Sequence, residues 1–147
     1  DRILDAAFTK EDIVSFLAQL RAEGALLQGW VAAQDGCVVG HIAFAKGHVE
    51  TRDGSYDMPM LTPLSVRVDL HGQGIGSTLI NQAHSDLASD YRHTCVLGHP
   101  TYYPRFGYEH YAQQPVASPW SQYPAFMIRG LHPVAGTWVG SKTILEG

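Results

Sequence analysis

The sequence LSVRVDLHGQGIGS at residues 64–77 is the most informative stretch of the chain. An apolar, strand-like run ends here, and glycines follow at every second position from Gly72 to Gly76. A helix is predicted to follow directly, because apolar residues recur every fourth position from Ile75 to Leu87. The first N–H groups of a helix have no intrahelical partner, and the helix dipole favours negative charge there. The stretch therefore predicts an anion site lined by main-chain amides.

Three kinds of phosphate-binding turn combine a strand, glycines and a helix. A P-loop is excluded, because it requires a Lys directly after the glycines and the sequence has none there. A dinucleotide fingerprint requires the spacing G-x-G-x-x-G, but the third glycine counted from Gly72 is Ser77. Counted from Gly74 it is Leu79, and the turn also follows several predicted strands rather than the first one. The alternative that remains is a turn that binds the pyrophosphate of coenzyme A.

Outward from this turn, periodicity and turn residues predict an alternation of helices and strands. No internal repeat, low-complexity tract or linker interrupts it. In chain order, the predicted elements begin with a helix capped by Thr9, a hairpin of strands 28–34 and 37–49 turning at Asp35-Gly36, a loop at 50–57, and a strand at 58–68 with a bulge or an unpaired position at Pro63. They continue with the helix that begins near Ile75, a strand at 94–97, a short helical turn at 100–106 ended by Gly107, and strands near 107–111 and 125–131.

A second motif, TYYPRFGY, occupies residues 101–108. Together, the two motifs resemble those of the GCN5-related N-acetyltransferase (GNAT) superfamily. The turn pattern of that superfamily, Gln/Arg-x-x-Gly-x-Gly/Ala, is matched by Gly74 and Gly76. The second motif resembles its aromatic-Tyr-x-x-aromatic-Gly-aromatic segment. The run from Val96 to Gly107 is especially similar to predicted bacterial acetyltransferases of the YhbS type.

The resemblance extends from about Asp1 to Leu131 and implies an α/β (α+β) fold, with a mixed, mostly antiparallel sheet flanked by helices. It implies a single acetyltransferase domain over residues 1–147, in which the N-terminal strand and the start of the first helix are missing. Two positions depart from the family pattern, because His71 replaces the usual Gln or Arg and Val68 stands where many members have Pro. The imidazole of His71 can still donate a hydrogen bond, so the expected phosphate site is retained.

The resemblance also implies which residues bind acetyl-CoA. Backbone groups of Leu64, Ser65 and Val66 are expected to pair with the pantetheine arm, and the Val66 N–H to polarise the thioester carbonyl. The pyrophosphate is expected to lie against the turn, formed by His71, Gly72, Gln73, Gly74, Ile75, Gly76 and Ser77. No metal ion is expected to take part.

Tyr103 aligns with the general-acid tyrosine of the family. A phenol stays protonated at neutral pH and can donate a proton to the leaving thiolate. The alternative is that Tyr103 only packs against Tyr102 and Phe106. His99 is the first candidate for the general base, and the alternatives are a chain of water molecules or the carboxylates Glu50, Asp57 and Glu109.

The function that the resemblance implies is transfer of the acetyl group of acetyl-CoA to a primary amine, by direct attack in a ternary complex. The acceptor amine belongs to a small molecule or a peptide. The rival hypothesis is a non-catalytic acyl-CoA-binding or regulatory module, which would keep the turn but lack a working acid or base. A homodimer is left open.

The composition of the 147 residues favours one soluble domain. Ten basic and fourteen acidic residues give a net charge of −4, which argues against a nucleic-acid binder held by a positive field. No apolar run approaches the roughly 18–20 residues of a membrane helix, so no membrane association is expected. Secretion is not expected, because the sequence from Asp1 shows no basic-then-apolar signal segment, and Cys37 and Cys95 lie in apolar stretches. Both are therefore predicted to be buried free thiols in a reducing, cytoplasmic compartment.

Two further groups of residues have alternative interpretations. The aromatic residues near the C-terminus either pack in the core or wall an acceptor pocket; they are Trp120, Tyr123, Phe126 and Trp138. His93 and His99 would share one face of a continuous strand. Solvated or core histidines are favoured there over a metal-binding pair.

Overall fold

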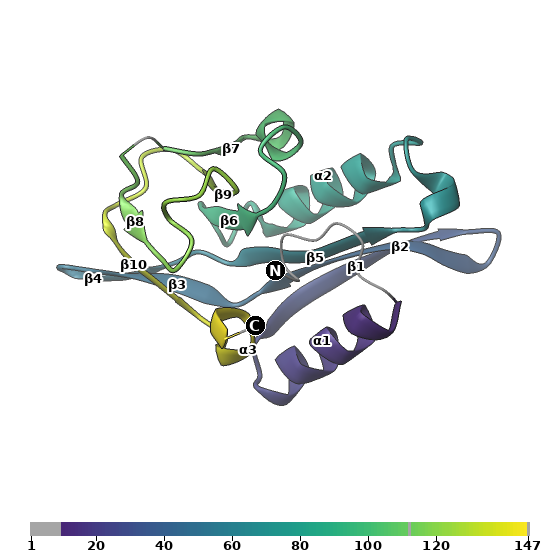
Figure 1. Ribbon diagram of the computed structural model, residues 1–147, viewed down its shortest axis with the longest axis horizontal. Coiled ribbons are helices and arrows are strands. Elements are labelled where there is room, and N and C mark those ends of the chain that lie inside the picture. The colour runs from purple at the N-terminus through teal and green to yellow at the C-terminus, as the bar shows by residue number, and fades with distance from the viewer. Residues whose placement is uncertain (1–9, 112, 147) are drawn as a thin grey trace.

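The computed structural model describes residues 10–111 and 113–146 (Figure 1). In chain order its elements are α1 (Lys10–Ala22), β1 (Leu26–Gln34), β2 (Cys37–Ala45), β3 (Gly47–Thr51), β4 (Gly54–Asp57), β5 (Met60–Val66), the 3₁₀ helix η1 (Val68–Leu70), α2 (Ile75–Leu87), β6 (Thr94–Leu97), the 3₁₀ helix η2 (Tyr103–Phe106), β7 (Tyr108–Glu109), β8 (Val116–Ala117), β9 (Phe126–Arg129), β10 (Gly136–Gly140) and α3 (Lys142–Glu146). The first predicted helix corresponds to α1, and its predicted cap, Thr9, lies outside the described residues.

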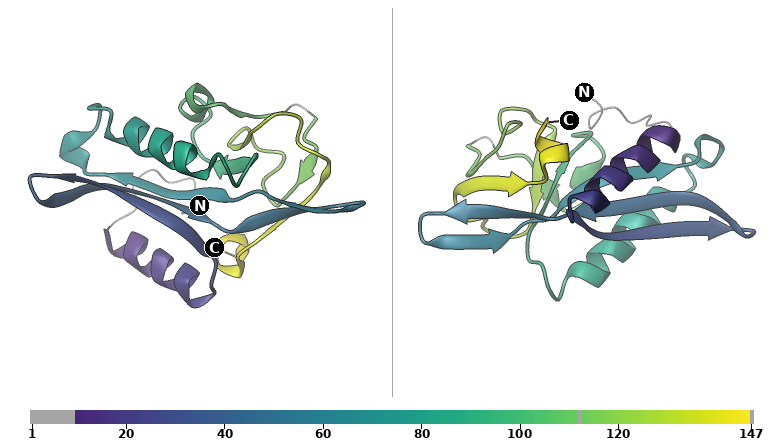
Figure 2. Two further views of the ribbon diagram at one scale, coloured as in Figure 1. Left: turned by 180° about the vertical axis from the view of Figure 1, so that it is seen from behind. Right: turned by 90° about the horizontal axis from the view of Figure 1, so that it is seen from below.

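The strands form two sheets. The larger has the order β1-β2-β5-β6-β9-β7, in which β5 and β6 run parallel and the other neighbours are antiparallel. The smaller has the order β4-β3-β10-β8, in which β10 and β8 run parallel. Helices α1 and α2 lie on opposite faces of the larger sheet, as Figure 1 and Figure 2 show. The predicted mixed, mostly antiparallel sheet flanked by helices is confirmed.

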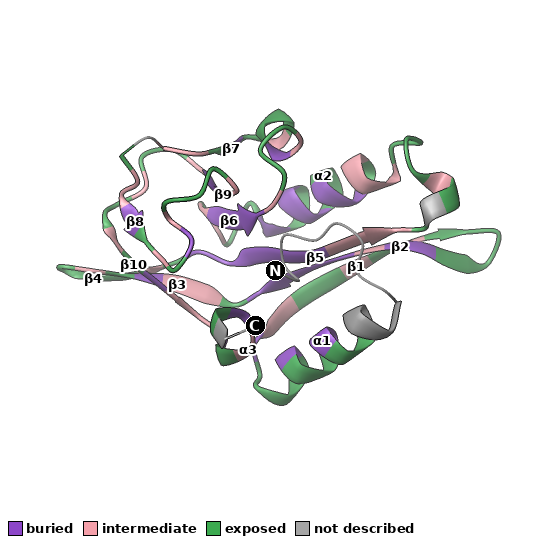
Figure 3. Cartoon of the chain, in the orientation of Figure 1, coloured by how far each residue is buried: buried purple, intermediate pink, exposed green. Residues whose placement is uncertain are grey.

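Side chains alternate between two apolar clusters on the two faces of the larger sheet. On β6, Val96 packs in the cluster under α2, whereas its neighbours Cys95 and Leu97 pack in the other cluster. Helix α2 contributes Leu79 and Ile80 to the first cluster. Figure 3 shows the inner face of this helix and strand β6 as buried. Full burial of one such side chain is worth about 1.5–3 kcal/mol, so the apolar stripe holds α2 on the sheet.

The hairpin predicted at Asp35-Gly36 joins β1 and β2. Both turn residues have positive φ, 52° and 79°, as a two-residue hairpin turn requires. The loop predicted at 50–57 is wrong, because these residues belong mostly to the hairpin β3–β4. The polar, turn-forming residues that suggested a loop form the tight turn between β3 and β4. Strand β3 also pairs with β10, a segment far along the chain in which no element was predicted.

The two cysteines differ in burial. Cys95 is fully buried in β6, as predicted, but Cys37 is exposed, so its predicted burial is wrong. Cys37 directly follows the hairpin turn at the end of the sheet, where apolar neighbours in the sequence are not matched by neighbours in space.

The C-terminal aromatic residues mostly pack in the core. Trp120, Phe126 and Trp138 are buried, with ring centroids 6.3 Å apart for Trp120–Phe126 and 5.9 Å for Trp120–Trp138. The Trp138 Nε1–H donates to the Met58 carbonyl (2.9 Å). Tyr123 alone of the four is exposed. The structure therefore favours the packing interpretation.

Candidate functional site

Strand β5 diverges from β6 over its second half. The two strands pair at residues 60–61 and 95–96, and the Gly98 N–H after β6 then donates to the Ala125 carbonyl (3.0 Å), next to β9. The register between β5 and β2 is irregular around Pro63, which confirms that the pairing of the strand is interrupted there, as predicted. Beyond this interruption β5 keeps β2 as its neighbour on one side and separates from β6 on the other. We call this divergence the splay.

Hydrogen bonds to β2 show which peptide groups of β5 face the splay. The Arg67 N–H donates to the Val39 carbonyl (2.9 Å), in the register that pairs Ser65 with His41. In an antiparallel pair, every second residue directs both its N–H and its C=O toward the partner strand, and the residues between them direct both groups away from it. Ser65 therefore points its N–H and C=O toward β2, whereas Leu64 and Val66 point theirs into the splay.

The imidazole of His71 binds the end of β5. Its Nε2 lies 2.8 Å from the Val66 carbonyl oxygen, and since a carbonyl can only accept, Nε2 carries the hydrogen. This bond uses the Val66 carbonyl and leaves the Val66 N–H facing the splay. The residue predicted to contact pyrophosphate thus ties the glycine turn to the strand.

The glycine turn has the backbone conformation that its sequence predicts. Gly72 and Gly74 have φ of 82° and 81°, in the left-handed region that favours glycine. Gly74 precedes α2 without a side-chain cap, and its carbonyl accepts from the Thr78 N–H (3.0 Å). The N–H groups of the first helical turn therefore have no intrahelical acceptor. The turn, residues 71–74, is exposed (Figure 3).

Two charged residues precede the turn and pair with each other. Arg67 binds Asp69 through Nε–Oδ1 (3.0 Å) and Nη2–Oδ2 (2.6 Å). The hydrogen bond from Arg67 lowers the pKa of Asp69 below its ordinary value. Because the Asp69 charge is matched by Arg67, the amides of the turn remain the groups suited to an anion.

Two adjacent tyrosines approach the splay from η2. The Tyr103 ring is buried against Gly98, where an added Cβ would lie 2.3 Å from Cε2, and burial raises the pKa of this phenol. Among the described residues, the buried side-chain polar atoms without a hydrogen-bond partner are His41 Nδ1 and Gln114 Nε2, and the Tyr103 hydroxyl is not one of them. Tyr102 is half-buried, and its hydroxyl lies beside Gly76.

The candidate general bases are scattered. His99 is exposed after β6, and its carbonyl accepts from the N–H groups of Tyr102 (3.1 Å) and Tyr103 (3.3 Å) at the start of η2. Glu50 lies on β3 and faces His48 (3.4 Å), while the other carboxylates, Asp57 and Glu109, end β4 and β7. His99 is the candidate that adjoins the splay.

A buried polar network behind the tyrosines was not predicted. The Tyr108 hydroxyl lies 2.9 Å from His84 Nε2 and 2.9 Å from Thr94 Oγ1. It connects α2, β7 and β6. Burial lowers the pKa of His84 from 6.5 to about 4, so the imidazole is neutral at pH 7. The Tyr103 ring packs edge-on against Tyr108, with centroids 5.8 Å apart, so the network supports the position of Tyr103.

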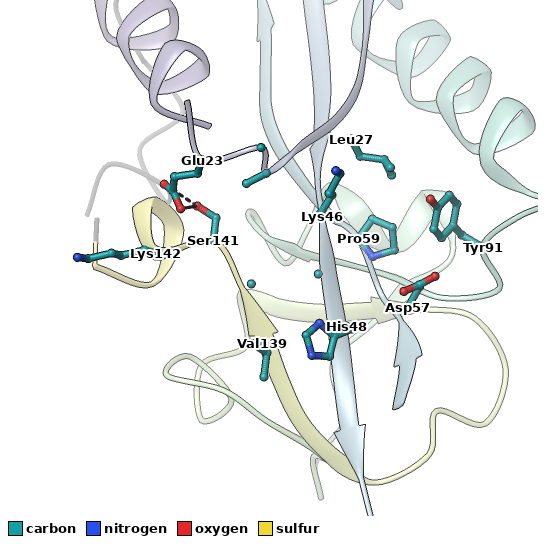
Figure 4. Close-up of a pocket in the computed structure, with 14 residues that line it drawn as sticks. Glu23, Leu27, Lys46, His48, Asp57, Pro59, Tyr91, Val139, Ser141 and Lys142 are labelled. Carbon is teal, nitrogen blue, oxygen red and sulfur yellow. Dashed lines mark hydrogen bonds between the residues drawn. The ribbon is translucent and has the colours of Figure 1, made fainter. Parts of the chain in front are cut away.

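A pocket lies at the other end of β5, where the two sheets meet (Figure 4). Its volume is about 480 Å³. Glu23 is already bound within it, to the Ser141 hydroxyl (3.0 Å) and the Thr143 N–H (3.0 Å). We call it the junction pocket, and its charged or polar lining residues are Glu23, Lys46, His48, Asp57, Tyr91, Ser141 and Lys142.

The described part of the chain contains no group of three or more His, Cys, Asp or Glu side chains arranged to hold a metal ion. His93 Nε2 donates to the Leu131 carbonyl (2.9 Å). Among the described residues, no helix has the length and apolar character needed to span a membrane.

Residues 2–111 match the model of the family described as the acetyltransferase (GNAT) domain. The chain is 36% identical over 104 residues to the uncharacterized N-acetyltransferase YjhQ of Escherichia coli K12, covering 69% of this chain and 57% of YjhQ. It is 30% identical over 122 residues to the uncharacterized N-acetyltransferase YhbS of the same strain, covering 82% of this chain and 72% of YhbS. The chain thus spans little more than half the length of YjhQ.

Two solved structures are similar over most of the chain. The E. coli YhbS structure in complex with CoA has a TM-score of 0.79 and 27% identity, covering 98% of this chain and 83% of that one. A Brucella melitensis GNAT family acetyltransferase in complex with acetyl-CoA has a TM-score of 0.72 and 28% identity, covering 94% and 81%.

Proposed function

The chain belongs to the GNAT family of acetyltransferase domains, and from this premise we propose that it transfers the acetyl group of acetyl-CoA to a primary amine. The observation on which this rests is the splay, where Val66 directs its free N–H beside an amide-lined glycine turn. The similar structures with bound CoA or acetyl-CoA support acyl-CoA as the donor.

The residues present fit such a donor. The first-turn amides of α2 suit a diphosphate without a basic patch, since the helix start attracts anions. The peptide groups of Leu64 and Val66 that face the splay suit the amides of a pantetheine arm. In this proposal the peptide groups of Leu64 and Val66 hold the arm and residues 71–77 hold the diphosphate, whereas Ser65, also expected to pair with the arm, directs its peptide groups to β2.

Bound acetyl-CoA supplies the thioester whose acetyl group passes to the amine, with a C–N bond formed and the C–S bond broken. The Val66 N–H donates to the carbonyl oxygen as negative charge develops there. A fixed backbone donor of this kind is worth roughly 3–4 kcal/mol in acyl transfer. The Tyr103 hydroxyl gives its proton to the departing sulfur.

The attacking amine must first lose a proton. His99 is the proposed base, acting directly or through water, because it is exposed and lies two residues after the end of β6, beside the splay. The acceptor is an amine of a small molecule or a peptide, and the proposal needs no metal ion and no nucleic acid.

The proposal is tested by release of CoA thiol from acetyl-CoA across a library of small-molecule and peptide amines. We expect saturable CoA binding by calorimetry and amine-dependent thiol release. CoA binding with no thiol release from any amine would favour the rival, a non-catalytic acyl-CoA-binding module. Absence of CoA binding would overturn both.

A further inference from the structure

The hydroxyl of Tyr102 lies where the splay meets the glycine turn. A Cβ added to Gly76 would lie 3.0 Å from this oxygen, 3.8 Å from Val66 Cγ2 and 3.9 Å from Leu64 Cδ2. The phenol oxygen therefore lies beside Gly76 in the first turn of α2, and the side chains of Val66 and Leu64 approach the same glycine. Glycine at position 76 permits this approach, although its φ is not positive.

Neighbouring side chains fix the Tyr102 ring in this direction. Tyr103 and Phe106 both meet it edge-on, each with a centroid distance of 5.2 Å. The Arg105 guanidinium lies 5.0 Å from the ring centroid and adds a cation–π contact. A ring held from three sides loses little further freedom when its hydroxyl binds a ligand.

Tyr102 and Tyr103 differ in what their hydroxyls can reach. Tyr103 is buried against Gly98, on the β6 side of the splay. Tyr102 is half-buried and reaches the start of α2, on the β5 side. The two phenols thus stand at different points along the path that the proposed donor would follow.

We propose that Tyr102 is a donor-binding residue, whose hydroxyl donates a hydrogen bond to the acyl-CoA diphosphate at the point where the pantetheine arm begins. This inference rests on the proposed function. An anion at the helix start already receives main-chain N–H groups, and a phenol beside them supplies one more donor, strengthened by the charge of the acceptor. Tyr102 does not protonate the sulfur, so its effect appears in donor affinity rather than in turnover.

The test compares Tyr102→Phe with wild type on two acetyl donors, acetyl-CoA and S-acetylpantetheine, which lacks the diphosphate. We expect about a tenfold rise in the KM of acetyl-CoA and in the calorimetric Kd of CoA, equivalent to about 1.4 kcal/mol. The kcat should fall far less, and kcat/KM for S-acetylpantetheine should fall less than twofold. Tyr91→Phe, in the junction pocket, is the matched control and should change neither constant.

A second variant keeps the inference testable if Tyr102→Phe folds poorly. Gly76→Ala places a Cβ 3.0 Å from the Tyr102 hydroxyl and displaces it, so it should weaken CoA binding severalfold. In the Tyr102→Phe background the same change should cost much less, because the displaced oxygen is already gone. Additive losses would contradict the inference.

Failure of the inference is distinguishable from failure of the proposed function. Wild type that binds CoA, with Tyr102→Phe binding it equally well, overturns the inference alone. A collapse of kcat on both donors in Tyr102→Phe also overturns it, because Tyr102 would then be the acid. Wild type that neither binds CoA nor releases thiol overturns the proposed function itself.

Discussion

The two ends of β5 are built from different kinds of groups. At the glycine-turn end, the groups suited to a ligand are main-chain amides, held in place by two glycines with positive φ and by one imidazole on the Val66 carbonyl. At the junction end, charged and polar side chains from several separate segments surround a pocket. The ends are separated by six residue steps from Met60 to Val66, roughly 20 Å at about 3.3 Å per residue.

The difference bears on the proposed phosphate site, because the protein has few charged residues. Only 16% of the residues are charged, and the amides of the turn need no basic patch. The charges of the junction pocket partly serve the fold instead, since Glu23 binds Ser141 and the Thr143 N–H at the start of α3. Substitutions at the glycine-turn end should therefore weaken donor binding or catalysis, whereas substitutions at the junction end should leave both nearly unchanged.

The largest expected contrast is between two tyrosines. Tyr103→Phe should lower kcat by about 100-fold or more, because general acid catalysis typically contributes a factor of about 10²–10⁴. CoA affinity, measured by calorimetry, should change less than twofold. Tyr91→Phe at the junction end should leave steady-state turnover at the wild-type level. Equal turnover in the two variants would remove the acid role from Tyr103.

The next contrast is between two histidines and concerns stability. His84 has a folded-state pKa of about 4, below the ordinary 6.5, so as the pH falls from 6.5 the unfolded chain binds the proton first. Stability is therefore lost on acidification through this window, by up to about 3 kcal/mol at the lower end. Urea unfolding at pH 7, 5.5 and 4.5 should show this slope.

His84→Gln should be less stable than wild type at pH 7, because the Tyr108 hydroxyl loses one of its two partners, but should show a flatter pH dependence. His48→Gln, at an exposed position of the junction pocket, should keep the wild-type slope. If both variants keep that slope, the acid sensitivity originates elsewhere.

Substitution of Gly74 tests the backbone of the glycine turn, and Gly24, between α1 and β1, is its control. Gly74 and Gly24 have φ of 81° and 68°, and an added Cβ would meet nothing within 4 Å at either position. Replacing either with Ala should cost about 1 kcal/mol of stability, because an L-residue is strained there. Only Gly74→Ala should weaken CoA binding, by about tenfold, since it disturbs the amides of the turn. Equal CoA affinity in both variants would place the diphosphate elsewhere.

The smallest expected effect concerns Asp57, an alternative base that the structure places in the junction pocket. Asp57→Asn should change the kcat of acetyl transfer less than twofold, because the carboxylate lies at the far end of β5 from Val66. His99→Gln should lower kcat at neutral pH by more. A pH–rate profile of both variants measures the difference, and a large loss in Asp57→Asn alone would move the base to the junction end.

Local chemistry made much of the donor end predictable. Gly72 and Gly74 predict a turn with positive φ, and the apolar spacing from Ile75 predicts α2. Pro63 predicts an interruption in the pairing of β5. Each of these inferences depends on residues within a few positions of one another. The hairpin at Asp35-Gly36 was predictable for the same reason.

Features that depend on distant partners were not predictable. The sequence predicts a loop where the hairpin β3–β4 forms, because β10, which pairs with β3, lies far along the chain. Neither the bond from His71 to the Val66 carbonyl nor the contact of Tyr102 with Gly76 has any periodicity or motif to reveal it. The same is true of the His84–Tyr108–Thr94 network.

The sequence alone specifies the strand–turn–helix proposed to bind an anion, because glycine conformation and helix amphipathicity are local properties. It also determined the likeness to an acetyltransferase family through two short motifs. Only the tertiary structure decided which peptide groups of β5 face the splay and which of two adjacent phenols reaches the helix start. Those outcomes depend on strand register and on packing between residues far apart in the chain, which no local pattern encodes.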